Sequence, residues 1–226
     1  MRKDGLEASL WDKNRVNQII HPAIDEKVAP MIITWRETLS YINRLGIAPT
    51  QNVLVIGSGA NALSLTNHCC NKGAKVTAVG SHSREGDYRS LPLRGYLSYK
   101  APNLEEQVRE LCAGERFDYI IDGVGGDRTV NLLLPLLKDG GTLAVYGWNG
   151  RGGYGVNPFR AEHSFRVYAN SYNEEESNAE VQALILRGKL DATLWYDMEH
   201  PVALEDIADA YDSLRRHEAL KYLIKL

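Results

Sequence analysis

The sequence is short of cysteine and of long apolar runs, and both shortages exclude classes of protein. Only three cysteines occur, two of them adjacent (Cys69 and Cys70), which fits neither a disulfide framework nor a spaced metal-binding pattern. No apolar run approaches the roughly 18 residues of a membrane helix, and the first residues lack the apolar core of a signal peptide. We therefore expect a cytoplasmic protein with reduced thiols and no membrane partner.

An excess of charge of one sign is missing as well. The 226 residues include 26 Lys and Arg against 29 Asp and Glu, and the basic residues are spread along the chain. Because a nucleic-acid surface needs clustered positive charge, we expect no nucleic-acid partner. The hydrophobic fraction of 44% and the charged fraction of 24% are typical of a globular protein with one large domain, or one domain and an appendage.

The most informative stretch is Val-Leu-Val-Ile-Gly-Ser-Gly-Ala-Asn-Ala at residues 53–62. Four apolar residues predict a buried strand, Gly-Ser-Gly predicts a tight turn, and a helix follows from Asn61 to Lys72. A strand, a glycine turn and a helix N-terminus together make a binding site for a pyrophosphate. Ala62 stands where a third glycine is usual, and its small side chain suffices there. The residues expected to contact the pyrophosphate are Gly57, Ser58, Gly59, Ala60 and Asn61.

The end of the second predicted strand, 75–79, bears on the choice of coenzyme. In a dinucleotide-binding unit, an Asp or Glu closing this strand selects NAD, whereas a nearby cation accommodates the 2′-phosphate of NADP. Here Gly80 closes the strand and no acid precedes Glu85. The loop instead offers hydroxyls, an imidazole and a guanidinium that can hold a phosphate. We therefore expect NADP rather than NAD, bound by Gly80, Ser81, His82 and Arg84.

Strands and helices alternate through the middle of the chain, which predicts an α/β fold with a doubly wound parallel sheet of about six strands, a Rossmann fold. A C-terminal α+β extension follows. The division we predict is an N-terminal arm or linker at 1–27, a nucleotide-binding domain at 28–172 and the extension at 173–226. Further strands are expected at 96–99, 117–122, 141–147, 164–169, 190–198 and 222–226, and helices at 28–45, 103–113, 128–138, 174–186 and 204–214.

Four local matches occur in a familiar order. They are the Thr34-Trp35 helix leading through Pro49 to the glycine turn, the segment 117–126, the segment 140–147, and 204–211 with 220–224 near the end. Together they resemble the medium-chain dehydrogenase/reductase family, which contains the zinc alcohol dehydrogenases and the quinone reductases. The resemblance runs from about residue 28 to the end. It implies an oxidoreductase that transfers hydride between NADPH and a small-molecule carbonyl, alcohol or activated double bond, and a homodimer paired through the strand at 164–169.

The strand ends and the resemblance together add candidate residues. Ligands bind at the carboxyl ends of parallel strands, so Val124 and Gly125 would flank the coenzyme ribose, and Tyr146 and Gly147 would lie along the nicotinamide. Lys221 matches a basic position of the family that can reach a coenzyme phosphate. An ordinary turn role for these glycines, and a solvated role for the lysine, remain open alternatives.

The chain also departs from the family pattern. Family members carry a substrate domain before the helix at residue 28, where this chain has 27 residues, so we expect that domain to be missing. The family's last zinc ligand would fall near Ala29 or Pro30, and neither side chain can bind a metal. We therefore expect no zinc, and no catalytic residue can be named. Two other functions stay open: a non-catalytic NADP-sensing or partner-binding module, and a methyltransferase that uses S-adenosylmethionine, which Gly80 disfavours because that fold generally has an acid at this position.

Overall fold

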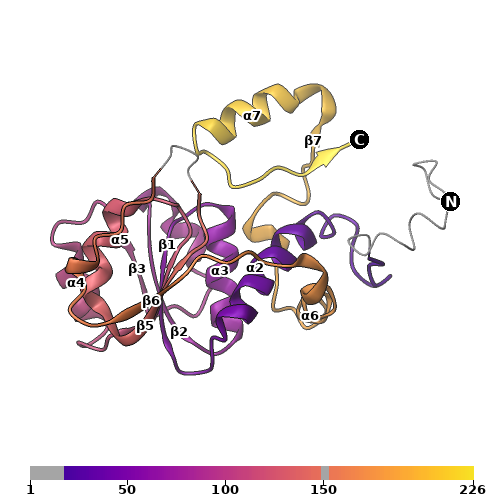
Figure 1. The fold of residues 1–226 in the computed structure, drawn as a ribbon. Helices are drawn as coiled ribbons and strands as arrows, with labels where there is room; N and C mark the ends of the chain where they lie inside the picture. The colour runs from indigo at the N-terminus through magenta and orange to yellow at the C-terminus, as the bar shows by residue number, and fades with distance from the viewer. Residues whose placement is uncertain (1–17, 149–152) are drawn as a thin grey trace.

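The computed structural model describes residues 18–148 and 153–226, and its centre is a six-stranded parallel sheet. The strand order is β3-β2-β1-β4-β5-β6, with helices on both faces (Figure 1). This is the doubly wound α/β fold that the sequence predicts. The strands are β1 (Asn52–Ile56), β2 (Lys75–Gly80), β3 (Gly95–Ser98), β4 (Phe117–Asp122), β5 (Leu137–Val145) and β6 (Phe165–Tyr168).

Strand β1 lies at the centre because its side chains are apolar on both faces. It pairs in parallel with β2 on one side and β4 on the other, and residues 53–56 are buried. Val53 and Val55 pack on one face of the sheet, whereas Leu54 and Ile56 pack on the other. An unbroken apolar run is what a strand covered on both faces requires.

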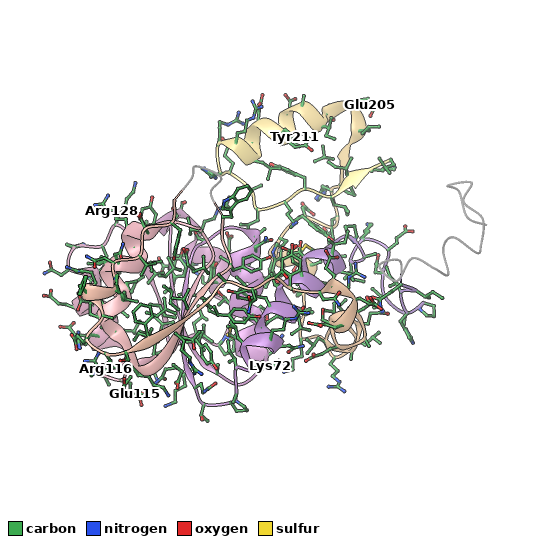
Figure 2. The ribbon with its side chains drawn as sticks, in the orientation of Figure 1. Lys72, Glu115, Arg116, Arg128, Glu205 and Tyr211 are labelled. Carbon is green, nitrogen blue, oxygen red and sulfur yellow. The ribbon has the colours of Figure 1, made fainter. Side chains whose placement is uncertain are left out.

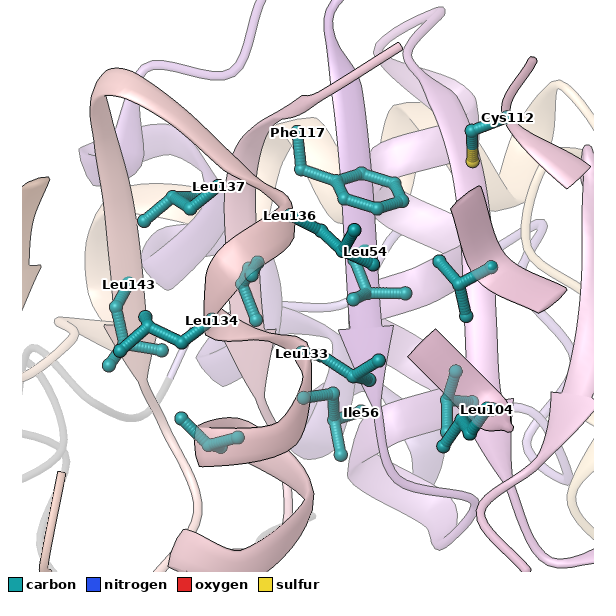
Figure 3. Close-up of a cluster of buried hydrophobic side chains, with 14 residues drawn as sticks. Leu54, Ile56, Leu104, Cys112, Phe117, Leu133, Leu134, Leu136, Leu137 and Leu143 are labelled. Carbon is teal, nitrogen blue, oxygen red and sulfur yellow. The ribbon is translucent and has the colours of Figure 1, made fainter. Parts of the chain in front are cut away.

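One face of the sheet is covered by α4 (Leu104–Leu111) and α5 (Asp127–Leu133). Figure 3 shows the resulting core, in which Phe117 from β4 and Leu133 from α5 approach Leu54 and Ile56 of β1. All of these side chains are almost wholly buried. Their packing holds the carboxyl ends of the central strands in fixed register.

The opposite face is covered by α2 (Met31–Leu45) and α3 (Ala60–Asn71), and α6 (Glu174–Leu186) packs on α2. Ion pairs support the α2–α6 contact, from Arg36 to Glu174 at 3.0 Å and from Arg44 to Glu176 at 2.8 Å. Residues just before α2 also reach α6, because the His21 amide donates to the Gln182 side chain. The first part of the predicted extension therefore joins the helical layer of the sheet.

Two of the predicted elements are wrong. The helix expected at 128–138 ends at Leu133, and a 3₁₀ turn, η2 (Leu134–Leu136), leads directly into β5. Pro135 has no N–H to continue an α-helix. The strand expected at 190–198 is instead a 3₁₀ turn, η4 (Ala192–Leu194), because the Asp191 carboxylate accepts the Thr193 N–H and caps the turn.

The rest of the C-terminal extension comprises η5 (Leu204–Asp206), α7 (Ile207–Arg215) and a two-stranded parallel pairing of β7 (Val202–Ala203) with β8 (Ile224–Lys225). Figure 2 shows Glu205 and Tyr211 on this extension at the opposite end of the molecule from Glu115 and Arg116, which precede β4. The extension thus lies beyond the carboxyl ends of the strands. No helix within the described ranges has the length and apolar character to cross a membrane.

Candidate functional site

The turn between β1 and α3 can be made only with glycine at residue 57. Gly57 has φ +132°, and a Cβ there would lie 2.9 Å from the Cβ of Ala62 and 3.2 Å from Cγ2 of Val124. The buried Tyr88 hydroxyl donates to the Gly57 carbonyl at 3.3 Å. The turn therefore brings the start of α3 close against the ends of β1 and β4, as the sequence predicts.

The N-terminus of α3 is open above this turn. Gly59 is the N-cap residue, no side chain caps the helix, and a Cβ at Gly59 would meet nothing within 4 Å. The first N–H groups of a helix have no partner inside it, and the helix dipole makes this end positive. A helix N-terminus of this kind suits an anion, and the binding of a pyrophosphate by the main chain from Ser58 to Asn61 stays a prediction.

At the end of β2, three polar residues follow the buried Gly80. The Ser81 N–H donates to the Ser58 hydroxyl at 3.0 Å, which ties this loop to the glycine turn. The Ser81 and Ser83 hydroxyls are 2.9 Å apart, and the side chain of His82 is 85% exposed. These groups stand where the sequence places them, at the carboxyl end of β2, in the loop that begins η1 (His82–Tyr88).

Arg84, in contrast, turns toward the C-terminal extension. Its Nη2 donates to the carbonyls of His217 at 2.6 Å and Ala219 at 2.7 Å, and Nη1 lies 3.4 Å from the Asp87 carboxylate. Only 12% of the side chain is exposed. Its predicted phosphate contact remains a prediction, and it requires these bonds to open.

The loops that follow β4 and β5 are in close contact at Gly125 and Gly147. Gly125 has φ +79°, and a Cβ at Gly147 would lie 2.4 Å from the Gly125 nitrogen. Neither position has space for a side chain, so both glycines serve the close approach of two main chains. Beside them, Val124 is 52% exposed just after the carboxyl end of β4.

Asp122, for which no role was predicted, stabilises this arrangement. Its buried Oδ1 accepts the N–H groups of Val124 at 2.9 Å and Gly125 at 3.1 Å. Burial raises the pKa of the carboxyl, whereas these backbone N–H groups lower it. The available signal was an acidic residue closing an apolar strand two residues before a glycine pair, a pattern that fits a side-chain-capped turn.

A second polar group, formed by Glu37, Tyr146 and Asn61, was also not predicted from the sequence. The Tyr146 hydroxyl donates to the Glu37 carboxylate from α2, and the Asn61 side chain donates to the same hydroxyl at 3.3 Å. The ring of Tyr172 lies 6.2 Å from that of Tyr146, and burial together with Glu37 raises the pKa of Tyr172 to about 12. Two of the predicted residues, Asn61 and Tyr146, are thus in contact, and a carboxylate from a third element bonds to the second of them.

Lys221 lies on the extension, where its N–H donates to the Trp195 carbonyl at 3.1 Å. The Trp195 indole in turn donates to the Ala60 carbonyl at 2.9 Å, so this part of the extension rests on the first turn of α3. Burial lowers the pKa of Lys221, and the charge of Glu37 partly opposes that shift. A cavity of about 420 Å³ lies between the extension and η1, with Arg84 and Lys221 in its wall.

Metal ligands are not grouped in the part of the chain that the structure describes. No three or more His, Cys, Asp or Glu side chains come together there in a way that could hold an ion. The residues near the family's last zinc position are Ala29 and Pro30, which do not fit a zinc ion.

Comparisons with known proteins agree with this geometry. Residues 56–187, more than half of the chain, match the family model described as "Zinc-binding dehydrogenase". A curated relative, L-galactonate-5-dehydrogenase of Escherichia coli K12, is 24% identical over 208 residues, which are 89% of this chain and 59% of that protein. The chain therefore spans about three fifths of the length of this relative.

Solved structures show the same fold. Alcohol dehydrogenase TADH from Thermus sp. ATN1 superposes with a TM-score of 0.80 at 21% identity, covering 92% of this chain and 62% of that one. Benzyl alcohol dehydrogenase from Acinetobacter calcoaceticus gives 0.78 at 17% identity, covering 92% and 59%. The match to the family model over residues 56–187 confirms the resemblance seen in the sequence, and the chain belongs to the zinc-binding dehydrogenases of the medium-chain dehydrogenase/reductase family.

Proposed function

We propose that this chain is the NADP(H)-binding part of an oxidoreductase that transfers hydride between NADPH and a small carbonyl, alcohol or enone. One observation carries the proposal: an open, uncapped helix N-terminus at Gly59 lies beside a strand that ends in Gly80 without a carboxylate. The first feature suits a pyrophosphate, and the second suits a coenzyme with an additional phosphate.

The chain's own residues would divide the coenzyme between them. The turn from Gly57 to Asn61 would hold the pyrophosphate, and the Ser81 and Ser83 hydroxyls with the exposed His82 would hold the 2′-phosphate. Tyr146 and Gly147 would line the redox end, near the exposed edge at Val124. The coenzyme, when bound, supplies the hydride. The protein supplies binding and orientation.

The substrate class is a separate proposal, which rests on the relatives and not on the geometry of this chain. The relatives named above are dehydrogenases of L-galactonate and benzyl alcohol, which favours an alcohol or its carbonyl product as the substrate class. This chain spans about three fifths of their length, and we propose that a substrate domain like theirs completes the site. Because Ala29 and Pro30 cannot ligate zinc, we further propose that carbonyl polarisation does not depend on that metal.

Calorimetric titration tests the coenzyme. We expect NADP⁺ to bind at least tenfold more tightly than NAD⁺, and S-adenosylmethionine not to bind. Gly57→Ala should abolish NADP⁺ binding, because it introduces strain at φ +132° and a contact with Ala62. Gly188→Ala is the matched control, since Gly188 also has positive φ (+65°) but follows the C-cap of α6, in open space.

Two results would contradict the proposal. Equal affinity for NAD⁺ and NADP⁺ would show that the end of β2 does not select the coenzyme. Binding of S-adenosylmethionine without either dinucleotide would indicate a methyltransferase.

A non-catalytic NADP-sensing module is the second candidate, and the polar group around Tyr146 favours it. The Tyr146 hydroxyl already bonds to Glu37 and Asn61, so its proton is directed to a carboxylate of the protein and not to a substrate. Both candidates bind NADP⁺. Reduction of NADP⁺ in the presence of a panel of primary and secondary alcohols, with the full-length protein, distinguishes them.

A further inference from the structure

The space beside Gly80 is occupied by two side chains from other elements. A Cβ built on Gly80 would lie 2.2 Å from the Tyr96 hydroxyl oxygen, 3.0 Å from its Cζ, and 2.6 Å from the Cβ of Ser58. Real Cβ atoms essentially never approach other atoms this closely. Residue 80 can therefore carry a side chain only if Tyr96 and Ser58 move.

Neither neighbour is free to move at low cost. Tyr96 comes from β3, its hydroxyl donates to the Ser81 carbonyl at 2.7 Å, and its ring packs on that of Tyr88 with 4.9 Å between centroids. Ser58 accepts the Ser81 N–H at 3.0 Å. The Tyr96 and Ser58 hydroxyls thus bind the C=O and the N–H of Ser81, immediately after β2.

We infer that Tyr96, together with Ser58, determines coenzyme specificity by occupying the position in which a ribose-binding carboxylate would stand. The inference rests on the proposed function and extends it to Tyr96, which lies outside the predicted site. A carboxylate at residue 80 would have to point its oxygens through the volume that the Tyr96 hydroxyl fills. The two neighbours, and not Gly80 alone, keep this strand end without a negative charge, and they fix the Ser81 main chain beside the expected 2′-phosphate.

The same contacts explain why a single substitution should not change the coenzyme. Introducing Asp at residue 80 adds the acid that normally selects NAD, but the acid meets Tyr96 and Ser58 first. Removing both obstacles creates the space that the acid needs. Specificity therefore depends on three positions from three elements, namely the glycine turn, β2 and β3.

A four-member set of variants tests this inference. It contains the wild type, Gly80→Asp, an opened background with Ser58→Gly and Tyr96→Ala, and Gly80→Asp in that background. The probes are 2′,5′-ADP and 5′-AMP, which carry the adenosine end of NADP and NAD, and binding is measured by calorimetry alongside the thermal unfolding midpoint. We expect Gly80→Asp alone to lower the midpoint and gain no affinity for 5′-AMP. In the opened background, the same change should raise 5′-AMP affinity at least tenfold relative to that background.

Three outcomes decide the inference. A gain in 5′-AMP affinity by Gly80→Asp alone, with an unchanged midpoint, would overturn it, because Tyr96 would then be no obstacle. A folded triple variant without that gain would also overturn it. A wild type that binds neither nucleotide would refute the proposed function instead, which separates the two failures.

A milder pair covers the case in which the opened background does not fold. Gly80→Ala should lower the unfolding midpoint, and adding Tyr96→Phe should restore part of the loss because the 2.2 Å contact disappears with the hydroxyl. Absence of any restoration would contradict the role given to Tyr96.

Discussion

At the scale of single residues, His68 shows how burial sets a titration. It lies wholly buried on α3, and desolvation lowers its pKa from 6.5 to about 3. The folded protein therefore keeps this imidazole neutral under conditions in which the unfolded chain already binds a proton. Stability that depends on neutral His68 is fully present above the unfolded pKa of 6.5 and is lost as the pH falls from there toward 3.

Below pH 6.5 the free energy of unfolding should fall by about 1.4 kcal/mol per pH unit, so it should be about 2 kcal/mol lower at pH 5 than at pH 7. His68→Leu should remove this part of the pH dependence, whatever its effect on stability at pH 7. His163→Gln, at an exposed position, is the matched control. Urea unfolding at the two pH values provides the measurement. An unchanged slope in His68→Leu would show that other groups cause the acid sensitivity.

At the scale of elements, the Arg84 guanidinium joins η1 to the C-terminal extension. Two main-chain carbonyls, from His217 and Ala219, accept its protons in a mostly buried setting. Bonds of this kind from a charged donor contribute more than neutral ones. The extension shares little regular structure with the sheet, so this contact and the Trp195 bond to Ala60 add to the apolar packing of Leu220 and Leu223 that holds it.

Arg84→Gln should therefore loosen the segment 217–223 without unfolding the sheet. Hydrogen exchange followed by mass spectrometry should show at least tenfold faster exchange in that segment and unchanged exchange in β1. Arg89→Gln, in the same loop but exposed, is the control. Equal protection in Arg84→Gln and wild type would mean that the contact does not hold the extension.

The helices and strands also show how much of the fold can be predicted from the sequence. The central strands of the sheet follow from apolar runs, because burial on both faces leaves a plain signal in composition. The edge strands β3 and β6 are only partly buried and give a weaker signal, although both were predicted. The segment 190–198 is apolar too, but no sheet edge is there to receive it, and the Asp191 cap makes it a turn. At the site, Gly57 was found because the turn after β1, with φ +132°, demands glycine. Gly59 and Gly80 were found from their places in the pattern, as the second glycine of the turn and the residue that closes β2.

Residues that act through distant partners left weaker signals. Glu37 and Tyr96 reach the site from α2 and β3, and only the tertiary structure shows them beside Tyr146 and Gly80. Arg84 illustrates the converse, because a sequence predicts that a guanidinium is present but not which acceptors it finds.

At the scale of the whole molecule, the sheet ends in β6, which pairs only with β5 among the described strands. Its Val167 is 59% exposed. A free edge with an apolar side chain invites pairing with another strand. We propose that two copies of the chain associate through this edge, in agreement with the homodimer that the sequence resemblance implies.

Light scattering after size exclusion should give twice the chain mass of 25.2 kDa. Val167→Asp should convert this dimer to a monomer, because two copies would place like charges at the shared edge. Ile33→Asp, at an equally exposed apolar position (58%) on α2, should leave the dimer intact. A monomeric wild type, or a dimer broken only by Ile33→Asp, would place the interface elsewhere or exclude it.

The contact of bare main chain between Gly125 and Gly147 has a mechanical consequence. Since no side chain separates the loops that leave β4 and β5, one cannot shift without carrying the other with it. The two loops therefore form one rigid unit, which the hydrogen bonds of Asp122 further stabilise. We expect any movement over a bound molecule to come instead from the end of the extension, where Arg84 bonds to the His217 and Ala219 carbonyls.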